Sequence, residues 1–190
     1  MKLNNIFQKI EFTNLKELDN QEFDIILDIR NEDDIRNNML SKNIILSSDH
    51  KNWINKIKNS KDNFFFAVKY EEKIIGGLAI NVNPDKKEIA DWAFYLSTKK
   101  NFIGLGFCLE IKALDFIFKK FRLNELQCLV FFENKKVHNL HKKIGFDEIP
   151  YENMHISFPN HNKFEKIICL SIKKSKWIKK REEIKIKYFF

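Results

Sequence analysis

The feature that most constrains the fold is a pair of glycines, Gly104 and Gly106, placed directly before a long apolar segment. The chain has 190 residues and only five glycines, so two so close together are informative. Residues 104–121 carry apolar side chains at helical spacing. A Gly-x-Gly turn that leads into a helix exposes backbone N–H groups, and a phosphate or pyrophosphate can approach them closely. The plainer alternative is a tight turn that needs a positive φ, and the pattern taken alone favours it.

The same stretch does not fit two common phosphate-binding motifs. A dinucleotide-binding fingerprint needs a third glycine, whose place is taken by Leu109, and no acidic ribose ligand is evident in a following parallel strand. A P-loop needs Gly-Lys-Ser or Gly-Lys-Thr, and neither follows. An anion bound at this turn would therefore occupy a different kind of site.

The composition predicts one globular domain with a basic tail. Hydrophobic residues make up 44% of the chain and include 19 phenylalanines, which is enough apolar material for a substantial core. The formal net charge is +8, but residues 173–190 hold seven lysines and one arginine against two glutamates, which leaves +2 for the rest. A positive balance suits anionic partners, yet here it says little about the main domain. We expect a domain over residues 1–174 and a basic tail over residues 175–190.

The tail allows two interpretations. It mixes basic side chains with Trp177, Tyr188, Phe189 and Phe190, which suits stacking on single-stranded nucleic acid. The same segment could be amphipathic and dock on the domain, on a membrane surface or on a second subunit. Because no known nucleic-acid-binding motif is present, we expect no nucleic-acid partner, and a homodimer stays open.

The cysteines and the N-terminus indicate a reducing compartment. Cys108, Cys128 and Cys169 lie far apart, and each falls inside an apolar run, so we expect buried thiols and no bound metal. The first residues lack the apolar core of a signal peptide. No apolar run approaches the roughly 20 residues of a membrane-spanning helix. We therefore expect a cytoplasmic protein without a transmembrane segment.

The hydrophobic periodicity predicts an α/β fold with a mixed, mostly antiparallel central sheet flanked by helices. Ser47 and Asp49 are good helix N-caps, and Gly145 suits the position after a helix end. Glu71 and Glu72 separate two strand patterns and indicate a hairpin turn. We expect strands over residues 6–15, 63–70, 73–83, 88–97, 125–132 and 163–174, and helices over residues 19–31, 47–60, 104–121 and 134–146.

The order of these elements changes the interpretation of the glycines. The strand over 88–97, the Gly-x-Gly turn with its helix, the strand over 125–132, Asn134 and the short helix that closes on Gly145-Phe146 resemble the GNAT superfamily of N-acetyltransferases. In that family the loop before the central helix carries Arg/Gln-x-x-Gly-x-Gly/Ala and binds the pyrophosphate of acetyl-CoA. The resemblance covers about residues 64–150 firmly, and it implies acetyl-CoA as the acetyl donor.

The resemblance also implies a set of contacts to acetyl-CoA. Asn101 stands where the family has Arg or Gln, which removes the usual side chain but leaves the backbone N–H groups that follow. The backbone of Phe94–Leu96 would pair with the pantetheine amides, as an added strand does. The positions implied to bind acetyl-CoA are Phe94, Leu96, Asn101, Phe102, Ile103, Gly104, Leu105, Gly106, Phe107, Asn134 and Asn139.

His141 takes the place of a tyrosine that in the family is thought to protonate the departing CoA thiolate. A histidine can also donate a proton, although its reference pKa of about 6.5 leaves a minority protonated at neutral pH. An imidazolium beside a developing thiolate would be stabilised. The alternative is an idle residue on the surface of the helix.

The carboxylates of the strand over 88–97 are candidate bases. The acceptor ammonium must lose a proton before or during attack on the thioester, and the family often places a carboxylate on this strand. Asp91 lies beside Trp92 among apolar residues, so burial could raise its pKa, while the alternative is a strand residue that faces solvent. Strand alternation puts Tyr95 on the same face as Asp91, so Tyr95 could share the site.

The N-terminal third indicates the acceptor. Arg30, Asn31, Met39, His50 and Trp53 follow a pattern that resembles two branches of the superfamily. One branch acetylates UDP-4-amino-4,6-dideoxy-N-acetyl-β-L-altrosamine in pseudaminic acid biosynthesis, which serves flagellin glycosylation, and the other acetylates the N-termini of ribosomal proteins. The first branch is favoured.

Each of these residues could contribute to binding a UDP-sugar. The Arg30 guanidinium matches phosphate oxygens, although it could equally be a solvated charge at a helix end. Met39 and Trp53 could line an apolar wall for a 6-deoxy sugar. For His50 and Trp53 the alternative is packing of their helix on the sheet, and for Trp53 it is the favoured one.

Direct transfer in a ternary complex is the expected mechanism. Cys108 and Cys128 fall inside a predicted helix and a predicted strand, with no base evident beside them in the sequence. A nucleophilic cysteine needs such a base. An acyl-cysteine intermediate is therefore not expected.

Overall fold

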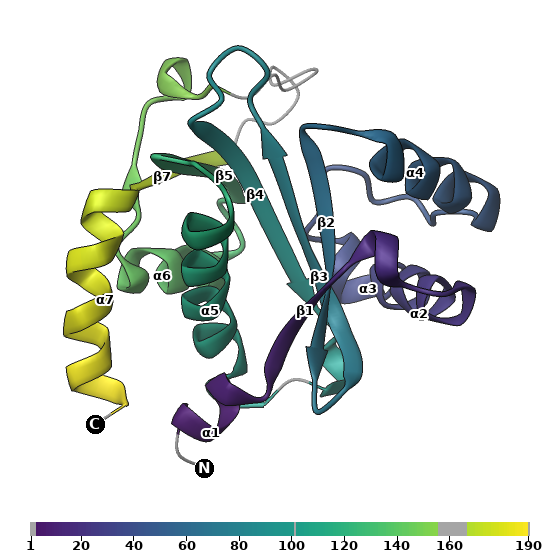
Figure 1. Cartoon of the computed structure of the whole chain (residues 1–190), viewed down its shortest axis with the longest axis horizontal. Helices are drawn as coiled ribbons and strands as arrows, with labels where there is room; N and C mark the ends of the chain where they lie inside the picture. Colours follow the sequence, from purple (N-terminus) through teal and green to yellow (C-terminus); the bar gives the residue numbers. More distant parts are fainter. Residues whose placement is uncertain (1–2, 101, 156–166, 190) are drawn as a thin grey trace. The chain divides into compact units, whose positions relative to one another are not determined.

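The computed structural model of the chain describes residues 3–100, 102–155 and 167–189. Seven strands form a sheet in the order β1-β2-β3-β4-β5-β7-β6, and helices flank it (Figure 1). Strands β4 and β5 are parallel, whereas the pairs β1–β2, β2–β3, β5–β7 and β6–β7 are antiparallel. The predicted fold class, a mixed and mostly antiparallel sheet flanked by helices, is confirmed.

The chain forms two compact units. The first comprises Leu3–Asn81 and Ala93–Gly106, and the second comprises Val82–Trp92 and Phe107–Phe190. Strand β4 (Ile89–Leu96) contributes its first half to the second unit and its second half to the first.

The first unit is built on the antiparallel strands β1, β2 and β3. The predicted hairpin between β2 and β3 is confirmed, and its turn places Glu71 and Glu72 at φ values of 48° and 64°. A two-residue turn with positive φ at both positions matches the twist of the strands that it joins. The other elements are α1 (Leu3–Gln8), β1 (Ile10–Asn14), η1 (Leu15–Glu17), α2 (Asn20–Arg30), α3 (Asp33–Arg36), α4 (Ser47–Asn59), β2 (Asn63–Tyr70), β3 (Lys73–Val82) and η2 (Thr98–Lys100).

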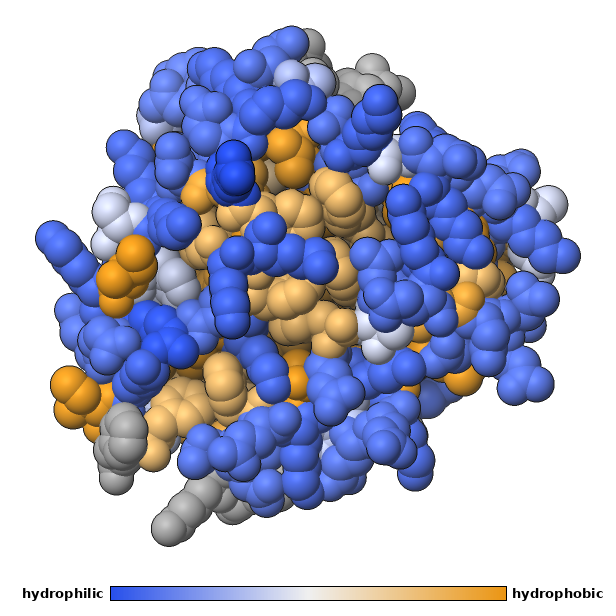
Figure 2. Space-filling view, viewed as in Figure 1, coloured by the Kyte–Doolittle hydropathy of each residue, from blue (hydrophilic) through white to orange (hydrophobic). Residues whose placement is uncertain are grey.

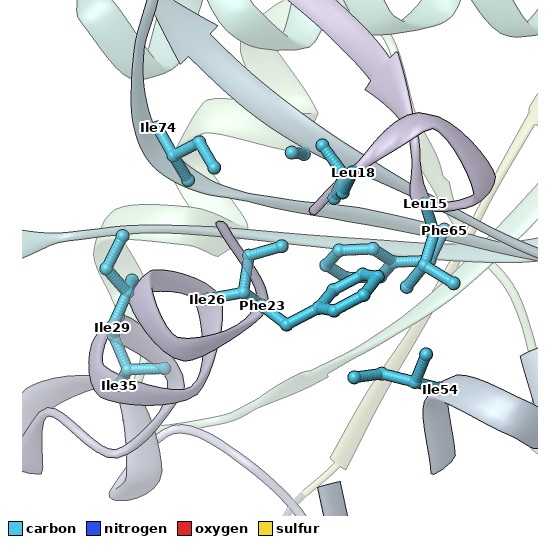
Figure 3. Packing of buried hydrophobic residues seen from close by; sticks show 10 residues of the cluster. Leu15, Leu18, Phe23, Ile26, Ile29, Ile35, Ile54, Phe65 and Ile74 are labelled. Atoms are coloured by element: carbon cyan, nitrogen blue, oxygen red, sulfur yellow. The ribbon is translucent and has the colours of Figure 1, made fainter. Parts of the chain in front are cut away.

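The core of the first unit lies between helices α2 and α4 and the sheet. Phe23 and Ile26 of α2, Ile54 of α4 and Phe65 of β2 are buried together in one apolar cluster (Figure 3). The apolar stripes that the sequence predicts on α2 and α4 are therefore the helix faces that pack on the sheet. Burying a side chain of this size stabilises a fold by about 1.5–3 kcal/mol.

The two helices begin differently. Helix α2 has a capping box, in which the Asp19 carboxylate accepts from the Glu22 N–H at 2.8 Å and the Glu22 carboxylate accepts from the Asp19 N–H at 3.1 Å. The predicted Ser or Asp cap of α4 is wrong, because Leu46 occupies the cap position without a side-chain hydrogen bond and Ser47 is the first helical residue.

The second unit follows the predicted order of strand, helix, strand, helix and strand. Because β4 and β5 are parallel, the chain must cross over between them, and helix α5 makes that connection. Gly145 ends α6 in a left-handed conformation, as predicted. The elements are the start of β4, α5 (Leu105–Lys120), β5 (Glu125–Phe131), α6 (Lys135–Ile144), β6 (Asp147–Glu148), η3 (Tyr151–Asn153), β7 (Ile167–Lys173) and α7 (Lys174–Tyr188).

One predicted strand starts at a different residue, and another extends beyond the described residues. The expected strand over residues 6–15 is wrong at its start, because helix α1 runs to Gln8 and β1 begins at Ile10. The last strand, β7, is present over Ile167–Lys173, and the preceding residues 163–166 of the prediction lie outside the described residues.

The basic C-terminal segment is a helix that packs on the second unit. Trp177 and Ile184 of α7 are buried, and the Trp177 indole N–H donates to the Asp115 carboxylate at 3.2 Å. Arg181 forms an ion pair with the same carboxylate. Of the interpretations left open by the sequence, docking on the domain is the one whose contacts are present, and it removes Trp177 from the exposed aromatic side chains.

The surface is largely hydrophilic on the face drawn in Figure 2, with hydrophobic side chains between the charged ones. Within the described part of the chain, no helix has both the length and the apolar character needed to cross a membrane.

Candidate active site

The loop before α5 has the backbone geometry that the sequence predicted for a glycine turn. Gly104 has φ of +91°, and a Cβ atom there would lie 2.6 Å from Leu3 Cδ2. Leu105, the first residue of α5, is fully buried, while the side chain of Ile103 is 98% exposed. Gly104 is therefore needed for the tight turn, and the same turn begins the helix whose N–H groups could bind an anion.

The remaining loop residues divide between the two units. The ring of Phe102 packs edge-on against Tyr70 with centroids 5.2 Å apart, within the first unit. Phe107 belongs to the second unit, where its ring contacts Tyr188 and the Lys143 ammonium. Asn101 lies outside the described residues.

A carboxylate that the sequence did not indicate holds the chain just before this loop. Glu32 accepts hydrogen bonds from the Ser97 hydroxyl at 2.6 Å, from the Thr98 N–H at 3.0 Å and from the Thr98 hydroxyl at 3.2 Å. The Ser97 N–H also donates to the Ile75 carbonyl at 2.7 Å. These bonds fix the end of β4 at the point where the chain leaves for the glycine turn.

The end of β4 also brings Tyr95 close to Arg30. Burial raises the pKa of the Tyr95 hydroxyl, and the Arg30 charge opposes that change. Burial lowers the pKa of Arg30, Tyr95 opposes the change and the charge of Arg36 adds to it. Arg30 Nη2 lies 3.5 Å from the Ser41 carbonyl, and Arg30 Nη1 is buried without a hydrogen-bond partner among the described residues. A half-buried guanidinium with an unused, buried donor is suited to an anion.

Asn31 and Met39, both predicted on the acceptor side, have structural contacts. The Asn31 side chain bonds both backbone groups of Ile45: its Nδ2 donates to the carbonyl and its Oδ1 accepts from the N–H, each at 2.9 Å. Met39 is half-buried and packs against the core of the first unit. Asn31 thus holds the loop that carries Met39.

His50 and Trp53 pack helix α4 on the sheet. His50 is buried, its Nε2 lies 3.1 Å from the Phe23 carbonyl, and its ring stacks on Trp53 with centroids 5.2 Å apart. Burial lowers the pKa of His50, while the hydrogen bond with Phe23 opposes the change. Trp53 meets Phe65 edge-on at 5.0 Å. The packing alternative that the sequence left open accounts for all of these contacts.

His141 lies inside the second unit, so the expected alternative of an idle surface residue is wrong. Its side chain is only 4% exposed, and its Nδ1 lies 2.6 Å from Oε1 of Glu110, which is 0% exposed. The rings of Trp92 and Phe146 contact the imidazole, with centroids 5.8 Å and 4.9 Å away. The imidazole is thus enclosed by two aromatic rings and a carboxylate.

Cys128 contacts the same imidazole. Burial alone would lower the pKa of His141, but the charges of Cys128 and Glu110, together with hydrogen bonds to both, hold this pKa well above its ordinary value of 6.5. Burial raises the pKa of the Glu110 carboxyl, and His141 opposes that change. The premise that no base lies beside Cys128 is therefore wrong, since His141 is far away in sequence but adjacent in the fold.

Asp91 is half-buried on β4, where it pairs in register with Gln127 of β5. Gln127 is fully buried, and its amide donates to the Glu125 carboxylate at 2.7 Å. The Ser171 hydroxyl donates to the same carboxylate at 2.7 Å. Asp91 therefore lies in register with a member of this polar network, and its predicted role as a base stays a prediction.

The two asparagines of α6 differ in what they do. The Asn134 side chain caps the helix by accepting from the Val137 N–H at 3.3 Å. Asn139 is exposed on the same helix. Within the described residues, no group of three or more His, Cys, Asp or Glu side chains could hold a metal ion.

The predicted catalytic residues belong to both units. Tyr95 lies in the first unit with Arg30, and Asp91 and His141 lie in the second. Sequence reasoning missed Glu110 and Glu32. The signal for Glu110 was available, since it is an acidic residue in the middle of an otherwise apolar helical pattern.

Comparisons with known proteins agree with the fold. Residues 15–165 match the acetyltransferase (GNAT) domain family. The acetyltransferase PseH of Campylobacter jejuni is 29% identical over 138 residues, which cover 72% of this chain and 84% of that protein.

Solved structures show the same fold. Spermidine N-acetyltransferase of Vibrio cholerae, in complex with CoA and spermine, matches with a TM-score of 0.75 and 18% identity, over 90% of this chain and 99% of the other. C. jejuni PseH in complex with acetyl-CoA matches with a TM-score of 0.63 and 18% identity, over 87% of this chain and 99% of the other.

The family match spans most of the sequence, including the glycine turn, the central helix and the helix that carries His141. The chain belongs to the GNAT family and is an acetyl-CoA-dependent N-acetyltransferase.

Proposed function

We propose that the protein transfers the acetyl group of acetyl-CoA to the 4-amino group of a UDP-linked dideoxy-amino sugar. The observation that carries the chemistry is the buried imidazole of His141, with Glu110 Oε1 2.6 Å from its Nδ1, on the helix where the family places its acid. The similarity to PseH and the Arg30–Trp53 pattern support the acceptor. Such a reaction belongs to pseudaminic acid biosynthesis and flagellin glycosylation, in the cytoplasm.

The acetyl donor is assigned to backbone groups near the glycine turn. The backbone N–H groups of residues 102–107 bind the pyrophosphate at the start of α5, and the Leu105 N–H among them also donates to the Phe102 carbonyl at 3.2 Å. The backbone of Phe94–Leu96 pairs with the pantetheine amides. Asn101, Asn134 and Asn139 supply further polar contacts to the donor.

The chemical step is a direct displacement. Asp91, acting through water or directly, takes a proton from the acceptor ammonium, with Tyr95 beside the acceptor. The neutral nitrogen attacks the thioester carbonyl carbon, the C–S bond breaks, and His141 gives its proton to the departing CoA sulfur. The nitrogen, which becomes the amide, releases its second proton to solvent, and His141 later regains one proton from solvent. Burial lowers the pKa of His141, but Cys128 and Glu110 hold this pKa well above its ordinary value, which favours the acid form.

The acceptor is assigned to the first unit. Arg30 offers its unused Nη1 donor to a phosphate oxygen of the nucleotide. Met39 supplies apolar contact for the deoxy sugar, on a loop that Asn31 holds in place. His50 and Trp53 shape this region from the core.

Acceptor choice is tested by following CoA release from acetyl-CoA with three amines: the UDP-4-amino sugar, a ribosomal-protein N-terminal peptide and spermidine. Turnover with the sugar is expected. Turnover with the peptide alone would move the assignment to the alternative of N-terminal protein acetylation. Absence of acetyl-CoA binding, together with a salt-dependent shift of nucleic acid, would instead support a non-enzymatic binder.

Direct transfer predicts that no acetyl group remains on the protein. Incubation with acetyl-CoA alone should leave the intact mass unchanged after gel filtration, because Cys128 is buried and serves here as a neighbour of His141. The measurement is mass spectrometry before and after hydroxylamine, which cleaves thioesters. A hydroxylamine-labile acetyl adduct on Cys128 would show a ping-pong mechanism.

The Glu32 contacts predict an effect on donor binding. Glu32→Ala removes three accepted hydrogen bonds at the entry to the glycine turn, and each such bond is worth about 1 kcal/mol. We expect the Kd of acetyl-CoA, measured by calorimetry, to rise by about tenfold. Asp33→Ala is the matched control. Asp33 is a neighbouring, exposed carboxylate, and its ion pair is with Arg36 rather than with the end of β4. Equal Kd values for the two variants would contradict the role of Glu32.

A further inference from the structure

Cys128 stands at one end of a buried row of three polar side chains in the second unit. Its thiol hydrogen-bonds the His141 imidazole, and His141 Nδ1 lies 2.6 Å from Glu110 Oε1. The three residues come from β5, α6 and α5, and each is at most 5% exposed. A thiol, an imidazole and a carboxylate in this order form an arrangement that activates a cysteine as a nucleophile. The proposed acetyl transfer leaves this thiol unused.

The imidazole is placed to act on the Cys128 sulfur. A cation beside a cysteine stabilises the thiolate, which is the reacting form of the side chain. Burial lowers the pKa of His141, but the charges of Cys128 and Glu110 and the hydrogen bonds to both hold this pKa well above its ordinary value. His141 is therefore able to serve as that cation, and Glu110 stabilises it in the charged form.

The other two cysteines of the second unit have surroundings that oppose ionisation. Burial raises the pKa of the Cys108 thiol to about 11. Burial also raises the pKa of Cys169, and the charges of Cys128 and Glu152 add to that change. Cys169 is 6% exposed and Cys128 is 5% exposed, so access to solvent does not separate these two. What distinguishes Cys128 is its hydrogen bond with His141, and Cys169 is therefore an internal control for its reactivity.

The carboxylate of Glu110 has an unused acceptor. Its Oε2 is buried and has no hydrogen-bond partner within residues 3–100, 102–155 and 167–189. A buried oxygen of this kind is commonly satisfied by a small O–H donor such as water. Hydrogen peroxide is an O–H donor of similar size, whereas a large electrophile such as acetyl-CoA is shielded from a sulfur as buried as that of Cys128. The site therefore favours a small polar reagent.

We propose that Cys128 is an oxidation site for hydrogen peroxide, at which the His141–Glu110 pair activates the thiol. The thiolate sulfur attacks one peroxide oxygen, an S–O bond forms and the O–O bond breaks. The leaving hydroxide takes up the proton that the thiol released and becomes water. Sulfur is oxidised by two electrons to sulfenic acid, and the peroxide is reduced to water. This inference goes beyond the proposed acetyl transfer and holds whatever the acceptor is.

The test compares the three cysteines within one protein. The full chain is treated with hydrogen peroxide, catalase stops the reaction, and the protein is then unfolded in dimedone, which traps sulfenic acid. Peptide mass spectrometry gives the oxidised fraction at each cysteine over time. Cys128 should be oxidised at least about tenfold faster than Cys169, because the thiolate is the form that reacts. Equal rates at the two cysteines would overturn the proposal.

Glu110→Gln tests the cause of the preference. It keeps the size and shape of the side chain but removes the charge that stabilises the imidazolium, so the rate at Cys128 should fall by about tenfold. Asp115→Asn is the matched control on the same helix. It loses its bonds with Trp177 and Arg181, and it should leave the rate at Cys128 unchanged.

Melting curves establish that each variant is folded. A folded Glu110→Gln protein that keeps the full preference for Cys128 would also overturn the proposal, because the pairing with Glu110 would not be its cause. If Glu110→Gln does not fold, the comparison of Cys128 with Cys169 in the unaltered protein decides the matter. None of these measurements needs an acceptor amine. Failure of every amine in the CoA-release assay would leave this result standing, and slow oxidation of Cys128 would leave the proposed acetyl transfer intact.

Discussion

Replacing His141 by alanine is expected to lower kcat by about 10²–10⁴-fold, the contribution of a well-placed general acid. The Kd of acetyl-CoA should change little, because the donor is held by the backbone near the glycine turn. The departing thiolate then leaves without a proton, while binding is unaffected. Calorimetry with acetyl-CoA and CoA release at saturating acceptor give the two quantities.

The same substitution also leaves Glu110 buried without its partner, so stability must be measured alongside kcat. His138→Ala is the matched control on helix α6. His138 pairs with Glu148 at 2.9 Å near the surface, and its loss should leave kcat unchanged. A folded His141→Ala protein with the kcat of His138→Ala would reduce His141 to a packing residue.

Gly76→Ala is expected to destabilise the first unit by more than about 3 kcal/mol, beyond the usual cost of overpacking. A Cβ atom at this position would lie 2.0 Å from the backbone oxygen of Tyr95 and 3.1 Å from the Leu96 Cα. Backbone cannot rotate away as a side chain can, so β3 and the end of β4 must separate. Thermal and urea unfolding give the loss, and acetyl-CoA binding should weaken with it because Phe94–Leu96 moves.

Gly77→Ala is the contrasting variant, since the neighbouring residue also has no room for a Cβ. Its added atom would meet the rings of Phe65 at 2.3 Å and Tyr95 at 2.9 Å, which are side chains that can move. We expect a smaller loss of unfolding free energy and a donor affinity closer to that of the unaltered protein. Equal losses for the two variants would mean that backbone separation is not the cause.

The fold could be predicted because its signals are local. The apolar runs in Asn63–Tyr70 and Lys73–Val82 and the helical stripe of Phe23, Ile26 and Leu27 depend only on neighbouring residues. The start of β1 could not be predicted, since residues 3–8 have no feature that separates a short helix from a strand. The cap of α4 was wrong because Ser47 and Leu46 differ by one position, which pattern alone does not resolve.

The sequence predicted the parts of the candidate site that depend on backbone conformation better than the parts that depend on side-chain burial. Gly104 and Gly145 predict turns with a left-handed backbone conformation, and both have positive φ. The pairing of His141 with Glu110 spans 31 positions of sequence, and that of Ser97 with Glu32 spans 65. Contacts at such separations produce no periodic pattern in the sequence that could predict them. His50 and Trp53 have the residue types of a binding site and also pack helix α4 on the sheet, and this packing could not be read from the sequence.

The two hydrogen bonds between the Asn31 side-chain amide and the backbone of Ile45 resemble the pair of hydrogen bonds that two β-strands exchange. Here a side chain takes the place of the partner strand. The two bonds fix the chain at one residue while Ile44 and Leu46 on either side remain exposed. The exposed residues 40–44 just before this anchor point can therefore change in composition without disturbing helix α4. Related proteins could reshape this stretch for different acceptors and keep the same scaffold, provided that an amide stays at position 31, since a carboxylate would leave the Ile45 carbonyl without its donor.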